Sequence, residues 1–154
     1  MATSRDDLLD LSDFAYTRLR DRMAGLTDRE YHWAPAAGFT TLVWRLGHII
    51  EFLRAERIGS WLGQDPLPAV EVSPSTALEV LAALEQAYQT WRGVLAATTE
   101  ESLAEPIGFG PYGQSTRRAF ALHILDELIH HGAEAALMRD LYATPLSNTD
   151  YAHT

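Results

Sequence analysis

Apolar side chains recur every three to four residues through most of this chain, which is the period of an amphipathic helix. The pattern predicts four long helices, at residues 4–24, 40–62, 76–95 and 115–143. Thr27 and Glu30 have the spacing of a capping box, so we expect residues 27–33 to form one short helical turn. No stretch alternates strictly between apolar and polar residues, so the pattern indicates helices throughout.

The connections between these segments indicate how the helices are arranged. Residues 63–75 are proline-rich and, at about a dozen residues, longer than a turn between neighbouring helices of a bundle needs. Residues 108–114 hold three glycines and one proline and must turn the chain sharply before the last helix. The sequence therefore predicts an all-α, four-helix bundle forming one domain over residues 1–154. Residues 145–154 are expected to be a loosely held tail.

The last predicted helix brings a carboxylate and an imidazole to the edge of the core. With successive residues about 100° apart, Glu127 lies at the margin of the apolar half, and His131 lies inside that half. Residues four apart have Cβ atoms about 5–6 Å from each other, so the two side chains point the same way. They could belong to a metal site or form an ordinary pair at the rim, and spacing alone favours the ordinary pair.

His48, on the second predicted helix, is a third polar group expected to face inward. A single inward histidine is more often a hydrogen-bonded core residue than a ligand. Two imidazoles and a carboxylate on facing helices would nevertheless suit Zn²⁺ or Ni²⁺ and leave a coordination position open. His130 lies on the polar side of its helix, where an ion pair with Asp126 is expected, and His123 is either a supporting group or a rim residue.

Three aromatic residues are candidates for lining a pocket near these groups. Trp44 and Phe52 flank His48 along its own helix, and Tyr112 lies in the glycine-rich connection. Aromatic residues at helical spacing are more often part of a core, so both interpretations stay open at this point.

Composition narrows the classes of partner. The chain has a formal net charge of −9 and no basic cluster larger than Arg117-Arg118, which argues against nucleic acid. It has no cysteine, so any thiol in its chemistry would have to come from outside. The first residues are too acidic for a signal peptide, and no run of about 18 apolar residues could span a membrane. We expect a soluble, cytoplasmic protein with no membrane partner.

Three stretches of the sequence resemble the DinB/YfiT-like superfamily: LTDREYHWAP at 26–35, TLVWRLGH at 41–48 and DELIHHG at 126–132. They occur in the same order as in the family and extend over nearly the whole chain. Within the superfamily, the sequence is most similar to the branch named for mycothiol-dependent maleylpyruvate isomerase and related low-molecular-weight-thiol S-transferases. The resemblance implies an up-down-down-up bundle with a long crossover between the second and third helices, and residues 63–75 fit that crossover.

The resemblance also implies a divalent-metal centre. Family members bind the ion through one histidine of the second helix and two residues, four apart, of the last helix. In the mycothiol branch the first of these two is glutamate. Carried over to this sequence, the ligands are His48, Glu127 and His131, and zinc or nickel is the expected metal.

The implied activity is that of an S-transferase or isomerase that activates an external thiol such as mycothiol. The electrophilic substrate would lie against Trp44, Phe52 or Tyr112, and His123 is a further pocket candidate. Arg45, about 60° from His48 around the helix, is the nearest cation for an anionic thiol. Family members are often dimers, so a homodimer is expected.

Two other functions remain open from the sequence. A metal-dependent hydrolase would need a general base, for which Glu51, one turn after His48, is available. A non-catalytic bundle that binds metal or dimerises is the other, because four helices with this much apolar surface need no metal to fold.

Overall fold

The computed structural model describes residues 3–144, and these residues form helices and loops without a strand. The long helices are α1 (Ser4–Met23), α3 (Leu42–Leu53), α5 (Ala77–Ala97) and α7 (Arg117–Ala143). The short ones are α2 (Asp28–Tyr31), α4 (Arg57–Trp61) and α6 (Glu100–Ala104). The predicted all-α bundle is confirmed, and the predicted loose tail at 145–154 lies outside the described residues.

Threonine side chains cap the beginning of each of these helices except α3 and α4. Thr27 and Thr76 each accept a hydrogen bond from the backbone N–H three residues later, and Glu30 and Glu79 bond back to the cap residue. Both capping boxes predicted from the sequence are therefore present, and the predicted short turn is α2. Thr116 caps α7 in the same way through the N–H of Ala119, which fixes the register of the helix that carries Glu127 and His131.

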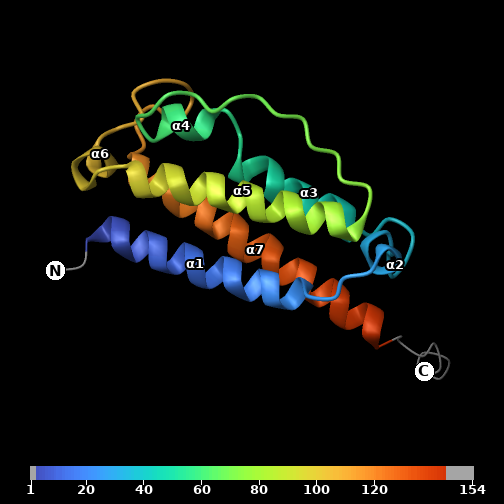
Figure 1. Ribbon diagram of the computed structural model, residues 1–154. Helices are drawn as coiled ribbons and strands as arrows, with labels where there is room; N and C mark the ends of the chain where they lie inside the picture. The colour runs from blue at the N-terminus through green and yellow to red at the C-terminus, as the bar shows by residue number, and fades with distance from the viewer. Residues whose placement is uncertain (1–2, 145–154) are drawn as a thin grey trace, which may run out of the picture.

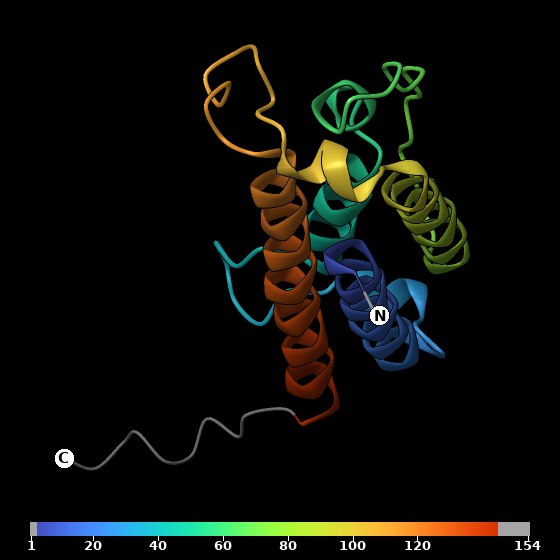
Figure 2. The same ribbon diagram turned by 90° about the vertical axis from the view of Figure 1, so that its left-hand side faces the viewer.

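The four long helices have the up-down-down-up connection (Figure 1). α1 and α7 run in one direction, and α3 and α5 run in the opposite direction. The chain between α4 and α5 passes back along the length of the bundle, which allows α3 and α5 to be parallel neighbours (Figure 1). Seen from the end, α7 lies against both α1 and α3, so a site between α3 and α7 is built from the second and last long helices (Figure 2).

The predicted helix at 40–62 is wrong in one respect, because the chain breaks after Leu53 and restarts as α4. On a continuous helix, Ile58 and Leu62 would lie about 140° and 180° around the axis from Leu53, away from the core. The break turns both side chains inward, and both are buried. α3 is therefore only 12 residues long, and α4 covers the end of the bundle.

Gly59 of α4 offers a test of this packing. A Cβ atom added there would lie 1.9 Å from the backbone oxygen of Asp65, whereas one added at Gly93 of α5 would meet nothing within 4 Å. We expect Gly59→Ala to destabilise the fold by about 1–3 kcal/mol through overpacking. Gly93→Ala should stabilise it by about 0.5–1 kcal/mol, because alanine loses less conformational entropy in a helix. Urea unfolding of both variants checks this, and equal effects would contradict the close approach.

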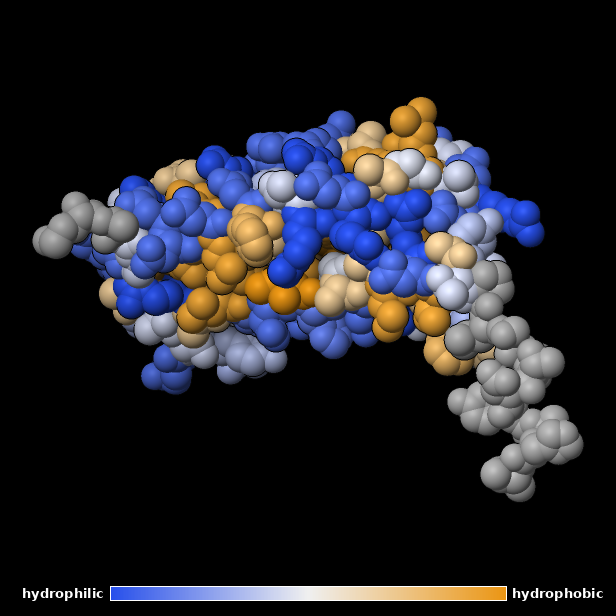
Figure 3. All heavy atoms as spheres, turned by 90° about the horizontal axis from the view of Figure 1, so that it is seen from below, coloured by the Kyte–Doolittle hydropathy of each residue, from blue (hydrophilic) through white to orange (hydrophobic). Residues whose placement is uncertain are grey.

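The face formed by α1 and α7 carries an apolar band along the seam between the two helices (Figure 3). A groove of about 450 Å³ follows this seam, with Ala15 and Leu19 on one side and Gly132 and Ala136 on the other. None of the described helices is both long and apolar enough to cross a bilayer.

Candidate metal centre

Three potential ligand atoms meet between α3 and α7, from His48, Glu127 and His131, here called the His48 triad. Glu127 Oε2 lies 3.7 Å from His48 Nε2 and 3.2 Å from His131 Nε2. The two imidazole rings are nearly perpendicular, with centroids 4.8 Å apart. The predicted residues are thus brought together, with one ring nitrogen of each histidine facing the same carboxylate.

The triad is partly buried, which suits a site that a small molecule can reach. The His131 side chain is 12% exposed, Glu127 is 28% exposed and His48 is 34% exposed. His131 therefore lies deepest, as its place inside the apolar half of α7 predicts, and His48 lies nearest the surface. One side of the triad stays open to solvent.

A second carboxylate holds the His131 ring in place. His131 Nδ1 lies 2.8 Å from Glu134 Oε2, and Arg45 of α3 forms an ion pair with that same oxygen. Burial alone would raise the pKa of Glu134, but the hydrogen bonds from His131 and Arg45 and the charge of Arg45 outweigh it and lower that pKa. An ionised Glu134 can accept the Nδ1 proton of His131, and in that tautomer Nε2 is the nitrogen without a proton that faces Glu127.

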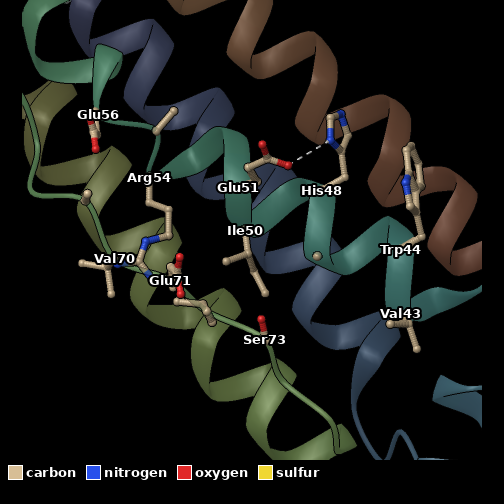
Figure 4. Close-up of a pocket in the computed structure, with 14 residues that line it drawn as sticks. Val43, Trp44, His48, Ile50, Glu51, Arg54, Glu56, Val70, Glu71 and Ser73 are labelled. Atoms are coloured by element: carbon tan, nitrogen blue, oxygen red, sulfur yellow. Dashed lines mark ion pairs between the residues drawn. The ribbon is translucent and has the colours of Figure 1, made fainter.

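Aromatic rings hold His48 from two sides. The Trp44 ring stacks on it, with centroids 5.0 Å apart and planes 15° from parallel, and Phe52 meets it edge-on at 5.6 Å. Glu51 Oε2 lies 4.0 Å from His48 Nδ1, on the ring edge away from Glu127 (Figure 4). Trp44 and His48 also line a cavity of about 790 Å³ between α3 and residues 69–73. The two predicted aromatic neighbours of His48 do contact it.

Two further groups of potential ligands overlap the triad. The His130 cluster consists of His130, His131 and Glu134, and the His123 cluster consists of His123, Asp126 and Glu127. Each lies on α7 alone, whereas the His48 triad joins two helices. In the His130 cluster, Glu134 is already neutralised by Arg45, which competes with a bound cation.

Several sequence predictions about neighbouring residues need correction. The ion-pair partner of His130 is Glu134, 3.4 Å from its Nε2, and not Asp126. Arg45 is held by Glu134, so it is not a free cation beside the triad. Tyr112 and His123 do line a cavity, as pocket candidates should, but it is a different cavity from the one that Trp44 lines.

His123 itself is exposed, and its Nδ1 lies 4.0 Å from Glu127 Oε1. His123 is therefore a rim residue whose ring lies beside Glu127. The sequence left two roles open for it, a supporting group and a rim residue, and its position is compatible with both.

Glu134 is the residue that sequence reasoning missed. It lies seven residues after Glu127, about 20° from it around α7, so it belongs to the same stripe. This spacing is the signal in the sequence by which Glu134 could have been identified as a neighbour of the triad. Its partner Arg45 could not be assigned, because the pairing depends on how α3 and α7 are aligned along their lengths.

Comparison with known proteins places the chain in a family. The family model of the DinB superfamily matches residues 12–135. The crystal structure of a conserved protein from Enterococcus faecalis superposes with a TM-score of 0.70 at 19% sequence identity, covering 92% of this chain and 98% of that one. At this identity the likeness concerns the fold. No curated protein matches the chain significantly. The family match covers α3 and the part of α7 up to residue 135, and the chain belongs to the DinB superfamily.

Proposed function

We propose that the protein is a divalent-metal-dependent enzyme, an S-transferase or isomerase that activates an external low-molecular-weight thiol such as mycothiol. The observation that carries this proposal is the convergence of the His48 triad between α3 and α7. The family match is consistent with this proposal, and the resemblance of the sequence to the thiol-transferase branch supports the choice of reaction.

The triad fits a metal ion of the zinc type. In a tetrahedral site with bonds of about 2.0–2.2 Å, ligand atoms lie roughly 3.3–3.5 Å from each other. The distances of 3.2 and 3.7 Å from Glu127 to the two histidines are close to this spacing. Two imidazoles and one carboxylate suit Zn²⁺ or Ni²⁺, and a three-residue donor set leaves a position for an exogenous ligand.

An ion held here would lower the pKa of a thiol that it binds, so that the thiolate is present near neutral pH. The chain has no cysteine, so the sulfur must come from a second molecule. The chain's own residues orient and hold the ligands. Glu134 fixes the His131 tautomer, and Trp44 and Phe52 fix the His48 ring.

A hydrolase is less well supported by the geometry. Its general base would have to reach a nucleophile on the Nε2 side of His48, where Glu127 lies. Glu51 is instead beside Nδ1, and its side chain is 81% exposed. Glu51 therefore lies on the other side of the His48 ring from such a nucleophile.

Thiol binding can be tested with cobalt-substituted protein. We expect mycothiol to give a thiolate-to-cobalt charge-transfer absorption, and its S-methyl derivative, which cannot form a thiolate, to give none. His131→Ala should show no such band, whereas His130→Ala should keep it. Equal spectra with mycothiol and its S-methyl derivative would overturn the thiol proposal. If no metal bound at all, a non-catalytic bundle would be the function that remains.

Glu134→Gln tests the support of His131. The substitution removes the charge that holds the Nδ1 proton and leaves Arg45 without its partner. We expect zinc affinity to fall about 10–100-fold, which is the usual cost of losing such a supporting group. Competition with a chromophoric chelator measures this. Glu51→Gln is the matched control and should change affinity less than about threefold, because an exposed charge contributes little.

The homodimer expected from the resemblance stays a prediction. The surface that favours it is the seam of α1 and α7, where the exposed Leu137 lines the groove together with the small residues Gly132 and Ala136. The same patch thus holds both a projecting side chain and a groove, as a two-fold interface requires. Analytical ultracentrifugation of wild type and Leu137→Glu tests it, and a wild-type protein sedimenting as a monomer would contradict it.

A further inference from the structure

A second cavity, of about 470 Å³, lies beside the first turns of α7 and has walls of aromatic rings. Its volume is in the range that small ligands occupy. Trp61 of α4 meets Phe120 edge-on at 4.9 Å and Tyr112 at 5.7 Å, so three aromatic rings from different parts of the chain surround one space. We call this cavity the Trp61 pocket.

The connection that carries Tyr112 is held in place by its own backbone. Ile107 donates its N–H to Ser115, Gly108 donates to Gly113, and Ser115 donates to Tyr112, each at 2.9 Å. Gly108 has a φ of 87°, which side chains other than that of glycine rarely allow. The wall formed by Tyr112 is therefore part of a fixed turn.

The charge in the Trp61 pocket is opposite to that of the whole protein. The chain has a net charge of −9, yet no carboxylate lines this pocket. Arg57 lies there with its guanidinium 5.8 Å above the Trp61 ring, and within residues 3–144 it forms no ion pair. His123, Ser115 and Tyr112 add groups that can donate hydrogen bonds. These walls suit a ligand with a flat apolar body and one negative charge.

The cavity that Trp44 and His48 line has the opposite character. Glu51, Glu56 and Glu71 line it, with Arg54 as the one cation (Figure 4). An anion would be repelled there and attracted to Arg57. The two cavities therefore differ in the ligands they favour.

His123 connects the Trp61 pocket with the triad. It lines the pocket, and its Nδ1 is 4.0 Å from Glu127 Oε1. A ligand held against His123 would thus be separated from the triad by this one side chain.

We infer that the Trp61 pocket binds a small monocarboxylate with a planar, apolar body, and that the electrophilic substrate of the enzyme belongs to this class. One arginine can pair with a carboxylate through two hydrogen bonds, whereas a doubly charged phosphate would call for more positive charge than the pocket offers. The identification of this ligand as the substrate rests on the function proposed above, whereas the binding of the ligand to the pocket does not.

Cinnamate, with cinnamamide as its neutral counterpart of the same shape, is a suitable probe. The indole N–H signals of the four tryptophans can be followed by NMR, with Trp61→Phe assigning one of them. We expect cinnamate to shift the Trp61 signal and to bind at least about tenfold more tightly than cinnamamide, because a charge-assisted hydrogen bond is lost with the amide.

Two arginine variants form the matched pair. Arg57→Gln should weaken cinnamate binding about tenfold, and Arg54→Gln, in the other cavity, should leave it unchanged. Equal binding by the two variants, equal affinity for the amide, or an unshifted Trp61 signal would overturn the inference. Binding that depends on Arg57 while mycothiol fails to bind cobalt would keep the pocket and refute the transferase. Mycothiol binding to cobalt, together with cinnamate binding that does not depend on Arg57, would refute the pocket and keep the transferase.

Discussion

Replacement of His48 with alanine is expected to lower zinc affinity more than about 100-fold, beyond the usual effect of losing a supporting group. The reason is that His48 is the only member of the triad on α3, so the remaining donors all lie on α7. His131→Ala should have an effect of the same size. Isothermal titration of metal-free protein with Zn²⁺ measures both.

His130→Ala is the control for these two variants. His130 is exposed and contacts Glu134 rather than Glu127, so its loss should leave zinc affinity within about threefold of wild type. Circular dichroism should show the same helix content in all three variants. A large loss in His130→Ala with no loss in His48→Ala would assign the metal to the His130 cluster.

Arg139→Ala is expected to destabilise the protein by about 2–4 kcal/mol, because it leaves a buried carboxylate without its partner. Arg139 of α7 bonds to Glu30 at 3.1 Å and donates to the backbone oxygens of Arg22 and Ala24, each at 2.8 Å. It therefore ties the last helix to the end of α1 and to α2. Urea unfolding at neutral pH gives the difference in the free energy of unfolding.

Arg22→Ala provides a comparison between the same two helices. Arg22 pairs with Asp140 at 2.5 Å, but both side chains are exposed, so this change should cost less than about 1 kcal/mol. If the two arginine variants lost equal stability, burial of Glu30 would not be the cause.

The Arg139 effect should depend on pH in a defined direction. Burial raises the pKa of Glu30, but hydrogen bonds from Thr27 and Arg139 outweigh it, so the pKa lies below its ordinary value of 4.5. Because the pKa of Glu30 is lower in the folded protein than in the unfolded chain, the ionised carboxylate stabilises the fold. This contribution is fully present above pH 4.5 and is lost as the pH falls through the pKa of Glu30 in the folded protein. The difference between wild type and Arg139→Ala should therefore be constant from pH 6 to 8 and shrink below about pH 4.5. A difference that grew in acid would contradict this assignment.

The positions of the long helices could be predicted from the sequence, because each has an apolar stripe and a capping box precedes α5. The break after Leu53 could not, because no proline or glycine marks it. The apolar residues on both sides of the break have helical spacing, so the pattern continues through it. The reason for the break is the burial of Ile58 and Leu62 at the end of the bundle, which the sequence alone does not reveal. α6 was missed because a helix of five residues has no detectable period.

The triad could be predicted because its members follow helical spacing and the family motif, and the structure brings them together. Groups that depend on contacts between helices could not be predicted. Arg45 is the nearest cation that the sequence offers to an anionic thiol, yet it is held by Glu134 from another helix. Arg57 and Trp61 went unnoticed because the Trp61 pocket exists only after α4 has turned away from α3 and met the connection before α7.

A crystal structure of the zinc-loaded protein, with anomalous scattering recorded at the zinc edge, would test the central claim most directly. The account predicts one strong anomalous peak between α3 and α7, about 2.0–2.2 Å from one atom of each member of the His48 triad. The Glu134 carboxylate should then remain on His131 Nδ1. A peak on α7 alone, at the His130 cluster or the His123 cluster, would contradict the assignment of the ligands. No peak at saturating zinc would contradict the metal centre itself.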